Sequence, residues 1–214
     1  MIKEVYLIRH SKPLKVNNDK NMDSLQIQNE KQPLSIEGEN IAREKLNIEE
    51  LKDIDKLYSS SYVRAISTAK YIAENNNIEI NVINDFWERK FGINSWDELP
   101  DNFGEKQFLD ENFKTVGGES QKDVRKRMDE VISEIIKNNK GKRIAIFSHG
   151  YAIIYYLLKY CKLISVNADR NITFSFNDKV VFDKKISAPE VFKLVFDSND
   201  KVISIENLEF DDLK

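Results

Sequence analysis

Two apolar runs of strand-forming residues each end abruptly at one of the chain's only two histidines. The first run is VYLI at residues 5–8, followed by Arg9 and His10; the second is IAIF at residues 144–147, followed by Ser148 and His149. Continuous apolar runs of this length are typical of strands covered on both faces, as in the parallel sheets of α/β proteins. Ligands of open α/β sheets bind beyond the carboxyl ends of the strands, so the sequence predicts a functional site around these two imidazoles.

Strands and helices are predicted to alternate along the remaining chain. Further strands are expected at residues 55–59, 78–83, 172–176, 190–196 and 202–205. Helices are expected after the capping residues Ser35, Ser60 or Ser61, and Ser120, and over residues 151–158. Residues 14–32 predict a loop, and residues 93–118 predict a partly helical lid. The pattern predicts one α/β domain over residues 1–214, a three-layer α/β/α fold with a β-rich C-terminal extension.

The composition narrows the classes of function. Lys and Arg total 33 against 36 acidic residues, and the net charge of −3 argues against a general nucleic-acid-binding surface. The single cysteine, Cys161, lies in an apolar helical stretch, where we expect it to be buried, and it excludes an internal disulfide framework. With no signal-peptide pattern and no apolar run of about 18 residues, we expect a cytoplasmic protein that binds no membrane.

Several kinds of catalytic site lack their sequence pattern. The seven glycines form neither GxGxxG nor a P-loop, and the histidines and Cys161 show no zinc-ligand spacing. The sequence does not exclude a magnesium site held by carboxylates. GxSxG is absent, and Ser148 and His149, as neighbours in a strand, would point to opposite faces. The remaining candidate is a nucleophilic imidazole, which attacks phosphorus well when arginines neutralise the phosphoryl oxygens and an acid protonates the leaving group.

The chain resembles the histidine phosphatase superfamily, branch 1, which has the phosphoglycerate mutase-like fold. The resemblance is carried by separated segments in the family's order: LIRH at residues 7–10, SSSYVRAISTA at 59–69, Glu88 followed by Gly92 and Trp96, and SHG at 148–150. Framework matches are Leu34-Ser35 with Gly38, and GES at 118–120 with Arg127. The pair Arg9-His10 alone would be a trivial match to the family, whereas all of these segments in the same order form a highly specific match.

The resemblance implies a role for each matching residue. His10 would attack phosphorus and carry the phosphoryl group. Its oxygens would be bound by Arg9, Arg64 and His149, with His149 protonated or donating a hydrogen bond in the transition state. Glu88 would protonate the leaving oxygen and then activate water. We therefore expect a phosphomonoesterase, a histidine acid phosphatase-like hydrolase, that forms a phosphohistidine and needs no metal or other cofactor.

Departures from the family pattern keep two other functions open. Ser11 replaces the usual glycine, and Lys12-Pro13 replaces a common pair of an acidic and a hydroxyl residue. The tryptophan–asparagine segment of mutases is missing, although Asn17 lies near the expected polar position. The alternatives are a phosphoglycerate mutase-type phosphotransferase and a non-catalytic module that binds phospho-ligands. As partners we expect a small phosphorylated metabolite, or a phosphoprotein, and no nucleic acid; an edge strand in the tail could pair two copies into a homodimer.

Overall fold

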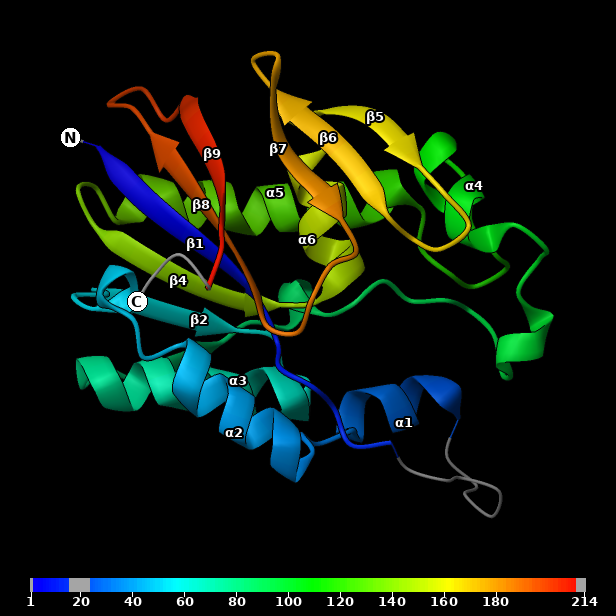
Figure 1. Ribbon diagram of the computed structural model, residues 1–214, viewed down its shortest axis with the longest axis horizontal. Helices are drawn as coiled ribbons and strands as arrows, with labels where there is room; N and C mark the ends of the chain where they lie inside the picture. The colour runs from blue at the N-terminus through cyan, green and yellow to red at the C-terminus, as the bar shows by residue number, and fades with distance from the viewer. Residues whose placement is uncertain (1, 16–23, 211–214) are drawn as a thin grey trace.

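The computed structural model describes residues 2–15 and 24–210, and a six-stranded sheet forms its centre. The strand order is β3-β2-β4-β1-β8-β9 (Figure 1). The parallel part consists of β1 (Lys3–Arg9), β2 (Lys56–Ser59), β3 (Ile80–Val82) and β4 (Arg143–Ser148). β8 (Glu190–Phe196) pairs antiparallel with β1, and β9 (Val202–Leu208) pairs antiparallel with β8. The α/β architecture expected from the two apolar runs is confirmed.

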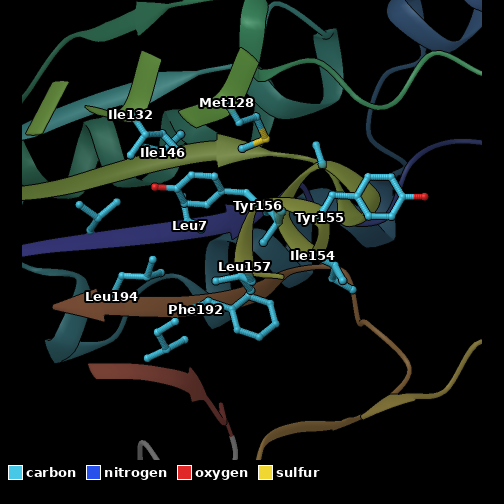
Figure 2. Close-up of a cluster of buried hydrophobic side chains, with 14 of the residues drawn as sticks. Leu7, Met128, Ile132, Ile146, Ile154, Tyr155, Tyr156, Leu157, Phe192 and Leu194 are labelled. Carbon is cyan, nitrogen blue, oxygen red and sulfur yellow. The ribbon is translucent and has the colours of Figure 1, made fainter. Parts of the chain in front are cut away.

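Helices cover both faces of this sheet. α2 (Ile36–Lys45) and α3 (Val63–Asn76) lie on one face, and α5 (Gln121–Asn138) and α6 (Gly150–Leu157) lie on the other (Figure 1). Within β1, Tyr6 and Ile8 pack toward α2 and α3, whereas Val5 and Leu7 pack with α5 and α6 (Figure 2). Successive side chains of a strand point to opposite faces, so a strand buried on both sides is apolar throughout.

The C-terminal strands divide between two sheets. β8 and β9 complete the central sheet, while β5 (Lys162–Val166), β6 (Ile172–Phe176) and β7 (Lys179–Lys184) form a separate three-stranded antiparallel sheet. The small sheet is attached to the core through Phe174 and Phe182, whose rings contact each other and Phe192 of β8. The β-rich extension is confirmed, although its last two strands belong to the main sheet.

Two local predictions are wrong. Residues 14–32 are not all loop, because α1 (Leu25–Lys31) begins after Ser24, whose side chain accepts a hydrogen bond from the Ile27 N–H. α3 has Tyr62 at its N-cap position and no side-chain cap, so neither Ser60 nor Ser61 caps it. The other two expected caps are confirmed: Ser35 accepts from the Gly38 N–H, and Ser120 accepts from the Asp123 N–H.

Residues 93–118 are partly helical, as expected. They contain α4 (Phe103–Leu109) and a 3₁₀ turn, Trp96–Glu98; other 3₁₀ turns are Glu49–Leu51 and Asn84–Phe86. Cys161 is buried, and burial raises the pKa of its thiol to about 12. Within residues 2–15 and 24–210, every helix is too short or too polar to cross a membrane.

Candidate active site

The two histidines lie side by side because the strands that precede them are neighbours. β1 and β4 pair in parallel with Arg9 opposite Ser148, so the next residue of each strand, His10 and His149, leaves the sheet at the same edge. Their ring centroids are 5.0 Å apart, and the ring planes are tilted by 60°. Both residues are buried. The structure thus brings together the two imidazoles that lie 139 positions apart in the sequence.

Arg64, in the first turn of α3, links the two rings. Its Nε donates to Nε2 of His10 at 2.9 Å, and its Nη2 donates to Nδ1 of His149 at 3.1 Å. Its Nη1 donates to the backbone carbonyl of Asn29 in α1. Only 3% of the Arg64 surface is exposed. An arginine has only donors, so each contacted ring nitrogen presents a lone pair to the guanidinium.

Hydrogen bonds and burial define the protonation of both rings. Nδ1 of His10 donates to the Ser11 carbonyl at 2.7 Å, and Nε2 of His149 donates to Oγ of Ser60 at 2.9 Å. Burial, followed by the positive charges of Arg64 and Arg9, holds the pKa of His10 well below its usual value. Burial and Arg64 lower the pKa of His149 in the same way. Each ring therefore presents an unprotonated nitrogen to the same guanidinium, and burial with nearby positive charge disfavours a second proton on either ring.

Glu88 is fixed beside the helix that follows His149. One carboxylate oxygen accepts from the N–H groups of Ala152 at 3.0 Å and Arg89 at 2.9 Å. The other accepts from the N–H of Tyr151 at 3.3 Å. His149 is the N-cap residue of α6, so Glu88 occupies the first turn of a helix whose start is part of the site. Glu88 is 8% exposed.

Arg9 lies at the end of β1 and contacts a different wall. Its Nη1 donates to the carbonyl oxygens of Ile186 at 2.7 Å and Ser187 at 2.9 Å. Its Nε is buried and has no hydrogen-bond partner among the described residues. Arg9 and Glu88 line a common cavity of about 150 Å³. All five predicted site residues thus lie at the carboxyl edge of the sheet, where Arg64, His10 and His149 form one group and Arg9 and Glu88 another.

Residues 5–176 match the family model of the histidine phosphatase superfamily (branch 1). The chain belongs to this superfamily. No curated protein sequence matches it. Among solved structures, YhfR from Bacillus stearothermophilus has 20% sequence identity and a TM-score of 0.67, covering 97% of this chain and 98% of its own. A mycobacterial glucosyl-3-phosphoglycerate phosphatase has 17% identity and a TM-score of 0.66, covering 97% of each chain. A phosphoglycerate mutase from Bacillus anthracis has 16% identity and a TM-score of 0.66, covering 97% and 92%. These similarities establish the phosphoglycerate mutase-like fold.

The serine that replaces the usual superfamily glycine forms hydrogen bonds with α2 and α3. Oγ of Ser11 donates to the Gly38 carbonyl at 2.8 Å, and the Ser11 N–H donates to Oγ1 of Thr68 at 3.0 Å. The φ angle of Ser11 is not in the left-handed region, so its side chain causes no backbone strain. Lys12 pairs with Glu37 at 2.6 Å. Asn17 lies outside the described residues.

The sequence did not reveal the buried residues that support Glu88. The adjacent Arg89 is 1% exposed and donates to the Glu119 carbonyl, the Gln107 side chain, the Tyr155 hydroxyl and the Phe113 carbonyl. Glu119 in turn accepts from Arg127 and from the Lys90 N–H. The sequence held one clue to this support. Glu119 and Arg127 both match the family pattern, and they lie eight positions apart around the start of α5.

Ser60 was also missed as a site residue. Besides accepting from His149, its hydroxyl oxygen lies 3.3 Å from the Tyr62 N–H, which donates to it. The Tyr62 ring packs edge-on against His149, with ring centroids 4.7 Å apart. Ser60 therefore fixes the His149 ring instead of capping α3. Within the described part of the chain, no group of three or more His, Cys, Asp or Glu side chains is arranged to hold a metal ion.

Proposed function

We propose that this protein is a metal-independent phosphatase that hydrolyses phosphate monoesters through a covalent phosphohistidine on His10. The observation that carries the proposal is the state of His10: its Nδ1–H is held by the Ser11 carbonyl, and its Nε2 lone pair faces the Arg64 guanidinium. An imidazole whose unprotonated nitrogen faces an oxyanion-binding cation is suited to attack phosphorus once a bound phosphate takes over the hydrogen bond from that cation. Superfamily membership supports the same function.

The first chemical step transfers the phosphoryl group to the protein. Nε2 of His10 forms a bond to phosphorus while the bond between phosphorus and the ester oxygen breaks, and Glu88, which enters this step as the protonated carboxylic acid, gives its proton to the leaving oxygen and becomes a carboxylate. Arg64 now donates to both rings, so a bound phosphate must replace these bonds with bonds to its own oxygens. The unpartnered Nε of Arg9 supplies a further donor.

The second step returns the protein to its starting state. Glu88 takes a proton from a water molecule, whose oxygen attacks phosphorus as the bond from phosphorus to Nε2 breaks. Inorganic phosphate leaves, and His10 recovers its lone pair. The cavity volume of about 150 Å³ beside Glu88 favours a small phosphorylated metabolite over a phosphoprotein. A cytoplasmic location and the absence of nucleic-acid and membrane partners remain predictions from the composition.

The test compares the wild-type protein with His10→Asn, which keeps a donor for the Ser11 carbonyl and removes the nucleophile. With p-nitrophenyl phosphate in the presence of EDTA, we expect phosphate release by the wild type and about a 10³-fold or greater loss in the variant. Rapid acid quenching should trap no phosphohistidine, so the labile intermediate is sought by quenching in alkali, where it is stable. Exposed Lys179→Gln serves as the control variant.

Three results would overturn the proposal. Undiminished turnover by His10→Asn would show that another group attacks phosphorus. Turnover of a phosphoglycerate without net phosphate release would establish a mutase-type phosphotransferase instead. Binding of phosphate esters with neither turnover nor labelled protein, across a panel of phosphorylated metabolites, would establish a non-catalytic module.

A further inference from the structure

Arg89 directly follows Glu88 in the chain and is buried, with 1% of its surface exposed. Its guanidinium forms no ion pair with any residue in the described ranges 2–15 and 24–210. All its acceptors are neutral: the carbonyl oxygens of Phe113 and Glu119, the side-chain oxygen of Gln107 and the hydroxyl of Tyr155. A buried cation held in this way carries a desolvation cost that an apolar side chain of similar size would avoid. The cost indicates that these hydrogen bonds have a use other than packing.

The guanidinium of Arg89 joins α4 to α6. Its Nη1 donates to Oε1 of Gln107 in α4 and to the hydroxyl of Tyr155 in α6, both at 2.9 Å. The Tyr155 hydroxyl donates to the same Oε1 at 2.7 Å, so the three groups form a closed triangle of hydrogen bonds. The ring centroid of Phe103 in α4 lies 5.0 Å from the guanidinium carbon. One side chain thus fastens the backbone next to Glu88 to two helices.

The attachment to α6 matters because the Glu88 carboxyl group is held by the same helix. It accepts from the N–H groups of Tyr151 at 3.3 Å and Ala152 at 3.0 Å, and N–H groups in a first turn have no acceptor within their own helix. Tyr155 lies about one turn after Tyr151. Two adjacent residues therefore hold successive turns of α6, and the bonds of Arg89 limit how far the Glu88 carboxyl group can shift along it.

We infer that Arg89 is a positioning residue, whose buried hydrogen bonds keep the Glu88 carboxyl group where it protonates the leaving oxygen. The inference rests on the proposed function for the role of Glu88. Among the described residues, Arg89 is not part of the lining of the cavity that contains Arg9 and Glu88, so it acts through Glu88. Proton transfer requires hydrogen-bond distance, and a misplacement of about 1 Å can lower the rate about 10²-fold.

Two variants weaken these hydrogen bonds to different degrees. R89K keeps the positive charge, but its single ammonium cannot reproduce the planar set of bonds. Y155F removes only the hydroxyl that accepts from Arg89 and keeps the buried ring, so it tests the inference even if R89K does not fold. Y156F is the matched control, because the Tyr156 hydroxyl lies 3.3 Å from that of Tyr160 and its ring leaves α6 in a different direction from that of Tyr155 (Figure 2).

The kinetic measurement is the dependence on the leaving group. With glycerol 3-phosphate, kcat should fall about 10²-fold in R89K and about fivefold in Y155F. With p-nitrophenyl phosphate, whose leaving group needs no proton, both losses should stay below about threefold. E88Q/R89K should be no slower with glycerol 3-phosphate than E88Q alone, because both changes act through one group. Equal losses with the two esters would overturn the inference, since a general distortion of the site affects both.

Amide hydrogen exchange measures the placement of Glu88 without turnover. The N–H groups of Tyr151 and Ala152 should exchange at least about threefold faster in R89K and Y155F than in the wild type, and at the wild-type rate in Y156F. The Gly38 N–H, which donates to Ser35 at the start of α2, should not change in any variant. Unchanged exchange at Ala152 in R89K and Y155F would overturn the inference even if the wild type hydrolyses phosphate esters. Faster exchange there supports it even if the wild type hydrolyses none, in which case only the proposed function fails.

Discussion

The floor and the walls of the site are built in opposite ways. On the floor, His10, Ser60, Arg64 and His149 are buried at the ends of strands or the start of α3, and hydrogen bonds link them to one another. The walls come from α1, residues 91–118 and the small sheet, and they expose Trp96 (53%), Arg170 and Lys185. The polar groups of the floor bond to one another, whereas on the walls Arg170 and Lys185 are exposed and form no ion pair with any residue that the structure describes.

Under the proposed function, the floor carries out the reaction and the walls select the substrate. Strand pairing fixes the floor, so its polar groups keep one geometry and a low-dielectric surrounding that strengthens their interactions. The walls consist of connections that can vary without disturbing the sheet. We therefore expect substitutions on the floor to affect all phosphate esters and substitutions on the walls to affect the choice among them.

Arg64→Lys gives the sharpest test of the floor. Lysine keeps the charge, but its single ammonium cannot reproduce the planar contacts with His10 and His149. We expect kcat/KM for p-nitrophenyl phosphate to fall by about 10³-fold, and by a similar factor for every ester tested. Arg43→Lys, an exposed position in α2, is the matched control. Retention of more than a tenth of the activity would mean that charge alone suffices.

Glu88→Gln tests the boundary between floor and wall. The amide oxygen can still accept from the N–H groups of Ala152 and Arg89, but the amide has no second acceptor for the Tyr151 N–H and cannot supply a proton. Alkyl phosphates need a protonated leaving group, so their kcat should fall by about 10²-fold. p-Nitrophenol leaves readily as an anion, and the loss with its ester should be much smaller when phosphoryl transfer limits the rate. Asp97→Asn, on the exposed wall, should change neither. Equal losses for both leaving groups would contradict the assigned role.

Alanine substitutions at two helical glycines compare how tightly the protein is packed beneath the floor and in a wall. A Cβ at Gly38 would lie 2.0 Å from the Lys12 carbonyl oxygen, so Gly38→Ala must push α2 away from the segment after His10. We expect a loss of about 2–3 kcal/mol in the free energy of unfolding. At Gly104 in α4 a Cβ meets nothing within 4 Å, and alanine there should add about 0.5 kcal/mol. Urea unfolding of both variants measures the difference; similar effects would contradict it.

Three residues of the floor, His10, Arg64 and His149, could be predicted because their signals are local. Each histidine follows an apolar run, and Arg64 stands in the first turn of a helix after a short strand, so chain-order patterns sufficed to place them. The parallel pairing of β1 with β4 then brought the histidines together. The layers of the fold could be predicted from the same kind of pattern. A strand covered on both faces is apolar throughout, whereas a helix covered on one face has apolar residues at every third or fourth position.

The rest depends on contacts between distant segments. In the sequence, Arg89 cannot be told from an ordinary surface arginine. Its hydrogen-bond partners are far from it along the chain: Gln107, Phe113, Glu119 and Tyr155. β5 and β7 were missed because they are short, largely exposed and interrupted in register, so neither shows a clear alternation. Ser60 looked like a helix cap because its contact with His149 is invisible to local sequence patterns.

The buried histidines predict a pH effect on the stability of the floor. Burial holds the pKa of His10 and His149 below about 6.5, the usual unfolded value, so the unfolded chain binds protons first as the pH falls. Above pH 6.5 neither contributes a pH dependence. Below it, the free energy of unfolding should decrease by up to about 1.4 kcal/mol per pH unit for each histidine. Urea unfolding between pH 6.5 and 5.5 measures the slope, and His10→Asn should reduce it by about half. A flat profile would show that the rings titrate normally.

The smallest effect is expected from Ser11→Gly, which restores the residue usual in the superfamily. The Ser11 hydroxyl bonds to Gly38 and not to the rings, so its removal should leave kcat/KM for p-nitrophenyl phosphate within about twofold. Losing that buried bond and gaining a flexible glycine should lower the free energy of unfolding by about 1 kcal/mol. Steady-state kinetics and urea unfolding measure the two effects. A gain of tenfold or more in kcat/KM would show that Ser11 lowers the catalytic efficiency of the wild-type site. It would also favour the alternative that the wild-type protein mainly binds phospho-ligands.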